Sequence, residues 1–282
     1  MKYDGKQESL HIQKELQKRV QVLKKKPVVA VISVPIHPSI ASFIAIKKRY
    51  ATALGITIQE YVFDDTVTTE KIKNTLQEII HTNSCDGIII QLPLPKTCDT
   101  TSLINSIPEN LDIDVLGEKA WQHFCISKTP IPPVAGAIAH ILTTTKTDIH
   151  NKKIVIIGKG KLVGEPISIL LKHQGVTPSI VEINTPDELR MSLYKDADVI
   201  ISGIGSPHHL KPEFCKKGVI LIDAGTSEQS GTLSGDIDPL CESIASIYTP
   251  VPGGVGPLTV ACLFKNLLNL LEKKYIKPAT LS

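Results

Sequence analysis

The sequence is poor in several features that would assign a protein to a class at once. Its 282 residues hold only 4% aromatic side chains, and 31 basic residues nearly balance 28 acidic ones, for a formal net charge of +3. Such a chain lacks the basic excess of a dedicated nucleic-acid binder. The longest apolar runs, such as GIIIQ at 87–91, fall far short of the roughly 20 residues that span a bilayer. We therefore expect neither nucleic acid nor a membrane as a partner.

Cysteine usage gives no sign of secretion or of a metal site. Six cysteines are scattered without a CxxC pair and without a histidine at metal-ligand spacing, so we expect reduced thiols and no bound metal. They stand at positions 85, 98, 125, 215, 241 and 262. The first ten residues, MKYDGKQESL, contain no apolar stretch of the signal-peptide type. Together these features predict a cytoplasmic protein.

Hydrophobic residues make up 42% of the chain, and its length suits two domains. In the first half, buried-type strands alternate with amphipathic helices, which predicts a parallel sheet covered by helices. The expected strands are Val28–Val34, Ile58–Phe63 and Gly87–Gln91. The expected helices are Ser9–Lys24 with Ser9 as N-cap, Ile40–Leu54 ended by Gly55, and Thr69–His81 with Thr69 as N-cap.

A second series of alternating elements begins after the proline cluster at 130–133. The expected strands are Lys153–Gly158, Ser179–Ile183, Val199–Ser202 and Val219–Asp223. The expected helices are Ile138–Thr143, Val163–His173, Pro186–Tyr194 and Thr259–Tyr275. The fold class is therefore α/β with two domains. We predict a first domain of residues 1–126 plus a returning C-terminal helix at 257–282, and a second domain of residues 127–256.

A glycine-rich turn lies between a strand and a helix of the second series. It reads GKGKLVG at 158–164, a GxGxxxG pattern in the strand–turn–helix context that dinucleotide binding requires. Glycines let the backbone approach a diphosphate, whose charge the amides at a helix N-terminus bind. Glu182, at the end of the next strand, suits a ribose 2′-hydroxyl and repels a 2′-phosphate, whereas Lys159 favours the phosphate. The alternatives are a turn without a ligand and a solvated strand-end charge.

Two proline-bracketed loops and two charged groups complete the set of candidates. QLPLP at 91–95 ends a buried strand and offers the Gln91 amide at its carboxyl end, where α/β sheets bind ligands. TPVPGGVGPLT at 249–259 indicates a tightly specified backbone. Lys47 shares a helix face with Phe43, and Asp112 and Asp114 share one side of an extended segment. The alternatives are rigid connections, a surface lysine and a solvated acidic loop.

Taken together, these segments resemble the bifunctional methylenetetrahydrofolate dehydrogenase/methenyltetrahydrofolate cyclohydrolase family. The resemblance covers about residues 5–272 and rests on TPVPGGVGPLT, QLPLP and GKGKLVGEP, in the family's order. It implies two α/β domains around a cleft, the second a Rossmann-like dinucleotide-binding domain, and a homodimer. It also implies that NADP oxidises 5,10-methylenetetrahydrofolate to the 5,10-methenyl form, which is hydrolysed to 10-formyltetrahydrofolate in the same cleft.

The resemblance carries the family's tyrosine-x-x-x-lysine motif onto Phe43 and Lys47, its folate-binding glutamine onto Gln91 and its pterin-binding aspartate onto Asp114. It implies that Lys47, hydrogen-bonded to Gln91, activates the attacking water or handles its proton. The expected catalytic residues are Lys47, Gln91 and Asp114. The expected folate-binding residues are Phe43, Gln91, Leu92, Pro93, Asp114, Pro252, Gly253, Gly254, Pro257 and Leu258. The expected cofactor-binding residues are Gly158, Lys159, Gly160, Val163, Gly164, Glu182, Gly203, Gly225 and Thr259.

The sequence departs from the family pattern at several of these positions. Phe43 replaces tyrosine and removes a hydroxyl next to Lys47. The segment at 34–40 lacks the glycine of the family's VGxxPAS, and LDIDV at 111–115 lacks the lysine and glycine that flank its two aspartates. Lys159 and Gly160 replace arginine and serine. Glu182 and Ile183 replace histidine and serine, which weakens a 2′-phosphate site and makes NAD the alternative cofactor.

These departures leave other functions open. If the altered positions have removed part of the chemistry, the alternative is a dehydrogenase that has lost the cyclohydrolase activity. If they have removed more of it, the alternative is a catalytically weakened protein that binds folate or a nucleotide. A third reading is a related two-domain dehydrogenase acting on an amino acid or a shikimate-like substrate. The two proline-bracketed loops argue against this third reading, and the bifunctional folate enzyme is the hypothesis taken forward.

Overall fold

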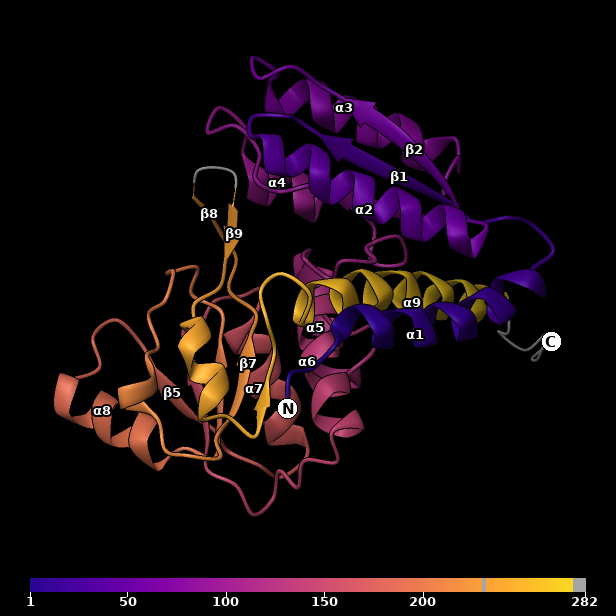
Figure 1. Cartoon of the computed structure of the whole chain (residues 1–282). Coiled ribbons are helices and arrows are strands. Elements are labelled where there is room, and N and C mark those ends of the chain that lie inside the picture. The colour runs from indigo at the N-terminus through magenta and orange to yellow at the C-terminus, as the bar shows by residue number, and fades with distance from the viewer. Residues whose placement is uncertain (230–231, 276–282) are drawn as a thin grey trace. The chain divides into compact units, whose positions relative to one another are not determined.

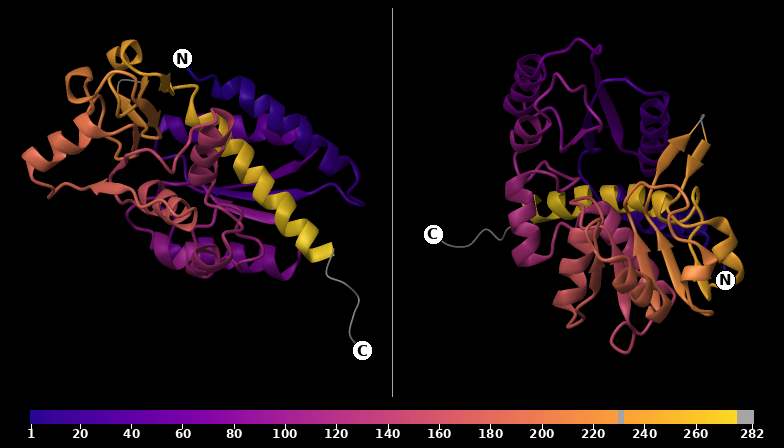
Figure 2. Two further views of the ribbon diagram at one scale, coloured as in Figure 1. Left: turned by 90° about the horizontal axis from the view of Figure 1, so that it is seen from below. Right: turned by 90° about the vertical axis from the view of Figure 1, so that its left-hand side faces the viewer.

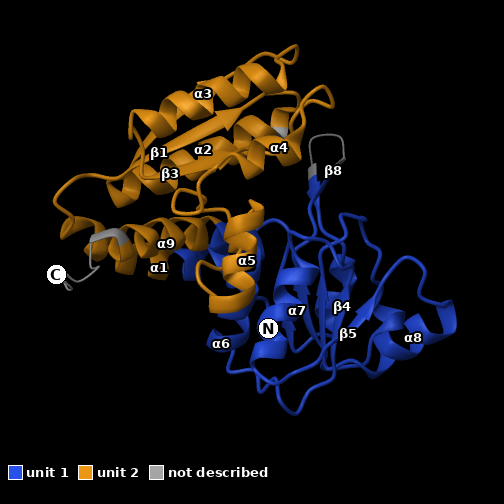
Figure 3. Cartoon of the chain, turned by 180° about the vertical axis from the view of Figure 1, so that it is seen from behind, with its two compact units in different colours: residues 1–9, 134–259 blue, residues 10–133, 260–282 orange. Residues whose placement is uncertain are grey.

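The computed structural model describes residues 1–229 and 232–275, which fall into two compact units (Figures 1 and 3). Unit 1 contains residues 1–9 and 134–259, and unit 2 contains residues 10–133 and the chain from residue 260 on. Helices α1 (Gly5–Gln21) and α9 (Val255–Tyr275) each begin in unit 1 and end in unit 2. Both units contain a parallel sheet with helices, so the α/β class is confirmed. The domain limits drawn from the sequence stay predictions.

Unit 2 is built on a three-stranded parallel sheet of order β2-β1-β3. Its strands are β1 (Val28–Ser33), β2 (Thr57–Val62) and β3 (Gly87–Ile90), joined by α2 (Pro38–Leu54) and α3 (Thr69–His81). The chain steps from β1 to one neighbour and then crosses to the other. Right-handed crossovers therefore put α2 and α3 on opposite faces of the sheet (Figure 1).

The core of unit 2 follows the alternation of side chains along these strands. Alternate residues of β1 and β3 pack with the apolar face of α3 in one cluster, so that this face of the sheet is closed. The members from these three elements are Ala30, Ile32, Ile88, Ile90, Ile72, Leu76 and Ile79. Two helices that the sequence patterns did not predict, α4 (Thr100–Asn105) and α5 (Glu118–Ser127), complete the unit.

The part of α9 that lies in unit 2 packs along α1 and α2 (Figure 2). Arg19 donates to Glu272 at 2.9 Å and to Asn269 at 2.8 Å. The ring of Tyr50 stacks on that of Phe264 with centroids 5.6 Å apart. On the same helix, the buried Asn266 side chain binds the loops that carry Ile113 and Ile131, which ties the segment next to Asp114 to α9.

Unit 1 contains a five-stranded parallel sheet of order β10-β7-β6-β4-β5. Its main elements in chain order are α6 (Pro133–Thr144), β4 (Ile154–Ile157), α7 (Gly164–His173), β5 (Ser179–Val181), α8 (Asp187–Asp196), β6 (Val199–Ser202), β7 (Ile220–Asp223) and β10 (Ile247–Tyr248), followed by the first residues of α9. A two-stranded hairpin of β8 (Ser227–Gln229) and β9 (Thr232–Ser234) follows β7. The four strands β4 to β7 agree with the predicted segments to within two residues at each end.

Two predicted N-caps are wrong, and two helices begin four or five residues earlier than predicted, α6 at Pro133 and α9 at Val255. Helix α1 begins at Gly5, so Ser9 lies inside it and is not its N-cap. The N-cap of α3 is Thr68, whose hydroxyl accepts from the Lys71 amide, and Thr69 is the first helical residue. The expectation for Gly55 is confirmed: it caps α2 in the left-handed region, at φ 79°. Neighbouring residues with similar capping chemistry explain the first two errors.

The described residues also bear on partners and metals. No helix among them is long and apolar enough to cross a membrane. Within the same part of the chain, no cluster of three or more histidine, cysteine, aspartate or glutamate side chains could hold a metal ion. All six cysteines are free thiols.

Candidate functional site

Lys47 occupies a core-facing position of α2. The buried residues Ile40, Ile44, Ala51 and Leu54 recur at helical spacing, and Lys47 falls in the same stripe. Pro38 stands in the first turn of the helix, where its missing N–H costs nothing. A lysine among apolar positions of one stripe is the sequence signal that separates Lys47 from its exposed neighbours. The helix thus holds an amine where a hydrophobic side chain would be expected.

Gln91 meets this amine at the carboxyl end of β3. Its backbone N–H continues the ladder with Ile32 at 2.8 Å, which places the buried side chain. The side-chain nitrogen donates to the Leu92 carbonyl at 2.8 Å, so the amide oxygen faces Lys47. Lys47 Nζ donates to that oxygen at 2.7 Å. The structure therefore brings together two predicted site residues, which are 44 positions apart in the chain.

Burial at this contact shifts Lys47 toward the neutral amine. Burial lowers the pKa of Lys47, and the nearby carboxylate of Asp114 opposes this effect without cancelling it. Burial likewise raises the pKa of Asp114, against the influence of Lys47. Gln91 is an uncharged acceptor, which stabilises the ammonium form less than a carboxylate would. The arrangement can therefore release and take up a proton at Lys47 Nζ.

Asp112 organises the turn that carries Asp114, a role that the sequence did not suggest. It is 1% exposed, and its carboxylate accepts from the Gly117 amide at 2.7 Å. Burial raises its pKa to about 6, although hydrogen bonds from the backbone of residues 115–117 counteract this rise. Val115 in this turn adopts φ 58°, a left-handed conformation that is costly for a β-branched residue. The buried carboxyl group of Asp112 thus holds a turn in which Val115 stands where the family pattern has a glycine.

The other predicted folate-binding residues of unit 2 lie beside this contact in the sequence. Phe43 is half-buried and precedes Lys47 by one helical turn on the same face. Leu92 is half-buried and Pro93 exposed, directly after Gln91. The polar contact between Lys47 and Gln91 therefore has the apolar residues Phe43, Leu92 and Pro93 as its neighbours along the chain.

In unit 1, the glycine turn is packed so tightly that side chains are excluded at two positions. A Cβ on Gly164 would lie 1.9 Å from the Gly158 carbonyl oxygen, and Gly158 has φ 85°. At Gly160, by contrast, a Cβ would meet nothing within 4 Å, and this residue and Lys159 are exposed. The turn is rigid at its base and open at its tip, where α7 begins. This geometry fits a diphosphate bound to backbone amides.

Gly203, another predicted cofactor residue, packs against this turn. A Cβ on Gly203 would lie 2.5–2.7 Å from the side-chain atoms of Val163. Gly158, Val163, Gly164 and Gly203 therefore form one group at the carboxyl ends of β4 and β6. Glu182 is exposed after β5, and its backbone amide is bound by the Thr185 hydroxyl.

The remaining predicted cofactor residues lie elsewhere in unit 1. Gly225 is buried after β7, and the Thr259 hydroxyl donates to the Val255 carbonyl within α9. No contact given for the described residues joins Gly225 or Thr259 to the glycine-turn group.

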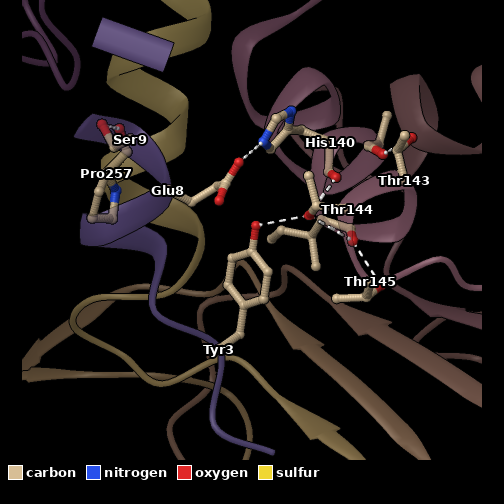
Figure 4. A network of polar contacts seen from close by, with 10 residues as sticks. Tyr3, Glu8, Ser9, His140, Thr143, Thr144, Thr145 and Pro257 are labelled. Carbon is tan, nitrogen blue, oxygen red and sulfur yellow. Dashed lines mark hydrogen bonds and ion pairs between the residues drawn. The ribbon is translucent and has the colours of Figure 1, made fainter. Parts of the chain in front are cut away.

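The first residues of the chain hold the loop before α9 and the first turn of that helix. The loop carries the predicted residues Pro252, Gly253 and Gly254, and the first turn carries Pro257 and Leu258. A Cβ on Gly5 would lie 1.8 Å from the Gly254 carbonyl oxygen, so only glycine permits this approach. The Ser9 hydroxyl donates to the Pro257 carbonyl at 3.0 Å (Figure 4). The sequence pattern did not predict either contact, because the pairing joins positions about 250 apart in the chain.

Two further contacts anchor the same N-terminal segment to α6 (Figure 4). Glu8 pairs with His140 at 2.9 Å, and the Tyr3 hydroxyl lies 3.1 Å from that of Thr144. Tyr3 also continues the sheet beside β10, since its amide donates to the Tyr248 carbonyl. The segment is thus tied down on both sides of Gly5.

Comparisons with known proteins agree with the two-part geometry. Residues 3–114 match the model of the tetrahydrofolate dehydrogenase/cyclohydrolase catalytic domain, and residues 132–275 match that of the family's NAD(P)-binding domain. The bifunctional protein FolD of Clostridium tetani is 35% identical over 277 residues, which cover 95% of this chain and 98% of that protein.

Solved structures show the same likeness. The bifunctional FolD dehydrogenase/cyclohydrolase of Campylobacter jejuni has a TM-score of 0.90 at 29% identity, covering 97% of this chain and 99% of that one. The Trypanosoma brucei methylenetetrahydrofolate dehydrogenase-cyclohydrolase, complexed with NADP cofactor and inhibitor, has a TM-score of 0.92 at 27% identity, with 98% of each chain covered.

Proposed function

Because the chain belongs to the tetrahydrofolate dehydrogenase/cyclohydrolase family, we propose that Lys47 and Gln91 perform its hydrolytic step and that the Gly158–Gly164 turn binds the cofactor of its oxidative step. The enzyme oxidises 5,10-methylenetetrahydrofolate to the 5,10-methenyl form and hydrolyses that product to 10-formyltetrahydrofolate. The observation that carries the assignment is the 2.7 Å contact between Lys47 Nζ and Gln91 Oε1, with burial lowering the pKa of the lysine.

In the hydrolytic step, water adds to the methenyl carbon and gives up one proton to form a neutral hydroxyl adduct. The hydroxyl then loses its proton as the bond from that carbon to N5 breaks, and N5 takes up a proton, so that the net release is one proton. Lys47 in its neutral form takes up the proton of the attacking water. Gln91 holds the amine by accepting one of its hydrogens, so the nitrogen lone pair is left for the water. A cationic substrate next to Lys47 further favours the neutral amine. Asp114 accepts from the amino edge of the pterin.

In the oxidative step, the nicotinamide cofactor, when bound, accepts a hydride from the folate methylene carbon. Gly158, Gly160 and Gly164 let the backbone approach the diphosphate, and Val163 and Gly203 support that turn. The folate is bound by the loop before α9 and by the first turn of that helix, through Pro252, Gly253, Gly254, Pro257 and Leu258. These assignments come from the family motif and from the packing of each segment within unit 1.

Of the two nicotinamide cofactors, we propose that the enzyme uses NADP, with NAD as the alternative. Lys159, exposed in the turn, supplies a positive charge for a 2′-phosphate. Glu182, also exposed, favours an unphosphorylated ribose. We further propose a homodimer in the cytoplasm, as the family resemblance implies. Size-exclusion chromatography with light scattering tests the dimer.

The decisive experiment follows both reactions with methylenetetrahydrofolate and either NADP or NAD. Reduced-nicotinamide absorbance reports the oxidation, and quantification of 10-formyltetrahydrofolate reports the hydrolysis. Turnover with both products supports the proposal, and the cofactor with the higher kcat/KM is the one that the enzyme prefers. No oxidation with either cofactor contradicts the proposal. Oxidation without the 10-formyl product would favour the second candidate, a dehydrogenase without hydrolase, which Phe43 motivates.

A further inference from the structure

A buried carboxylate lies beneath the loop that follows β6. Asp236 is 0% exposed. Its Oδ2 accepts from the Ser202 hydroxyl and from the Ile204 amide, both at 2.7 Å, and its Oδ1 accepts from the Ser206 amide at 2.8 Å. Three donors from one short loop thus converge on a single side chain, which comes from a segment about 30 residues further along the chain.

The loop in question, residues 202–206, packs directly on the glycine turn. Gly203 leaves no room for a side chain against Val163, and a Cβ on Gly158 would lie 2.5 Å from the Ile204 side chain. Because these contacts are at their limit, a displacement of the loop must move the turn as well. The Asp236 carboxylate therefore controls the backbone that borders the turn.

A second carboxylate holds Asp236 in place. Asp223, at the end of β7, accepts from the backbone amides of Asp236 at 3.1 Å and Ile237 at 2.8 Å. Gly225 supplies the space, since a Cβ there would lie 2.1–2.3 Å from the carboxylate atoms of Asp236. The close approach of Asp236 therefore explains why a glycine is needed at position 225. The described contacts do not join Gly225 itself to the glycine-turn group.

We propose that Asp236 is a positioning residue of the dinucleotide site, which holds residues 202–206 against the Gly158–Gly164 turn. It acts through the loop backbone. This inference rests on the proposed assignment of the turn to the nicotinamide cofactor. A carboxylate suits the role because it can accept from three donors at once, whereas an amide side chain offers only one oxygen.

The test is the substitution Asp236→Asn. The amide nitrogen cannot accept, so at least one of the Ile204, Ser206 and Ser202 donors is left without its partner and the loop shifts. Isothermal titration with NADP and with NAD should show Kd raised by about tenfold or more for the cofactor that wild type binds. In steady state, the dinucleotide KM should rise more than kcat falls, and the ratio of dehydrogenase to hydrolase activity should drop.

Two variants keep the test decisive. Asp238→Asn is the matched control, because Asp238 lies two residues after Asp236 and caps the short helix Pro239–Ser243. This substitution should leave the dinucleotide Kd within about twofold of wild type. Ser202→Ala removes a single donor and should raise Kd about threefold, which carries the test if Asp236→Asn does not fold.

The outcomes separate this inference from the proposed function. If Asp236→Asn, or Ser202→Ala in its place, binds the dinucleotide as tightly as wild type, the positioning role is wrong while the function stands. If wild type itself binds neither NADP nor NAD, the cofactor assignment fails and the inference falls with it.

Discussion

The two units build their candidate sites from opposite materials. In unit 2 the chemistry belongs to buried side chains, where Lys47 meets Gln91 and burial lowers the pKa of the amine against the influence of Asp114. In unit 1 the binding surface is backbone, kept clear by glycines and held by buried carboxylates. The difference teaches how each site can fail. Removing a functional group should damage unit 2, whereas adding a methyl group should damage unit 1.

The largest expected effect is on hydrolysis, from Lys47→Met. Methionine keeps the length and apolar stem of lysine but cannot take up a proton. We expect kcat for hydrolysis of methenyltetrahydrofolate to fall about 100- to 10,000-fold. The disappearance of the methenyl substrate measures this directly. Oxidation of methylenetetrahydrofolate should fall far less, because proton transfer by Lys47 is not part of hydride transfer.

Lys48→Met is the matched control for this variant. Lys48 directly follows Lys47, but its side chain is exposed and paired with Glu60. We therefore expect the rate of hydrolysis in this variant to stay within about twofold of wild type. In wild type, hydrolysis should rise with pH as Lys47 loses its proton, with a midpoint below 10.5 because burial lowers this pKa. Retained hydrolysis in Lys47→Met would remove the lysine from the mechanism.

The second prediction concerns the buried carboxyl group of unit 2. Burial raises the pKa of Asp112 to about 6 from 3.8, so the folded state binds a proton that the unfolded state has already lost. The contribution of Asp112 to stability therefore decreases as pH rises from about 4 to above 6, by at most about 3 kcal/mol. Asp112→Asn lacks this dependence and should gain stability relative to wild type over that range.

Urea unfolding of both proteins at several pH values measures this difference. The Asp99→Asn variant is a useful comparison, because Asp99 caps α4 at the surface. We expect this variant to be less stable than wild type, by about the same amount at neutral pH as at higher pH. A constant difference between wild type and Asp112→Asn from pH 4 to 8 would show that this carboxyl group titrates normally.

The third prediction adds a methyl group to the turn of unit 1. Gly164→Ala puts a Cβ 1.9 Å from the Gly158 carbonyl oxygen, so the turn must open. Overpacking of this kind costs about 1–3 kcal/mol, and the dinucleotide Kd should rise about 10- to 100-fold. Gly160→Ala, where a Cβ meets nothing within 4 Å, should have a smaller effect. Equal effects of the two variants on Kd, measured by titration, would mean that the base of the turn is not what binding requires.

The fourth prediction adds a methyl group to the N-terminal support of the loop before α9. Gly5→Ala should displace the Gly254 carbonyl, which a Cβ would approach to 1.8 Å. We expect the KM for methylenetetrahydrofolate to rise about tenfold, with a smaller change in kcat. Gln7→Ala, on the exposed side of the same helix turn, is the control. An unchanged KM in Gly5→Ala would show that this loop tolerates displacement.

The sequence predicted the repeating parts of the fold, because a strand such as Val199–Ser202 is a run of buried residues that carries its own signal. Through motifs that a family resemblance can transfer, it also predicted the hydrogen bond between Lys47 and Gln91, while the catalytic roles of these residues stay predictions. It did not predict Gly5 or Asp236. A glycine near a chain end and an aspartate in a loop have no local pattern, and their roles arise only where the fold brings distant segments into contact.

The same limit explains the short elements. The helix α5 has a modest apolar face, and β8 and β9 are three residues each, too short for periodicity to register. Asp112 was singled out with Asp114 as an acidic pair, yet its burial could not be read from the sequence. Burial of a polar group depends on the donors around it, and here these are backbone amides of its own turn.

The smallest expected effect comes from restoring the family's hydroxyl in Phe43→Tyr. Phe43 precedes Lys47 by one helical turn, so a tyrosine hydroxyl would stand on the same face as the amine. A hydrogen bond there would help to orient Lys47, and we expect hydrolysis to rise about threefold while oxidation stays nearly constant. Assays of both activities in the variant and in wild type measure the ratio. A fall in hydrolysis would mean that apolar surroundings, which lower the pKa of the amine, matter more to Lys47 than a hydroxyl partner.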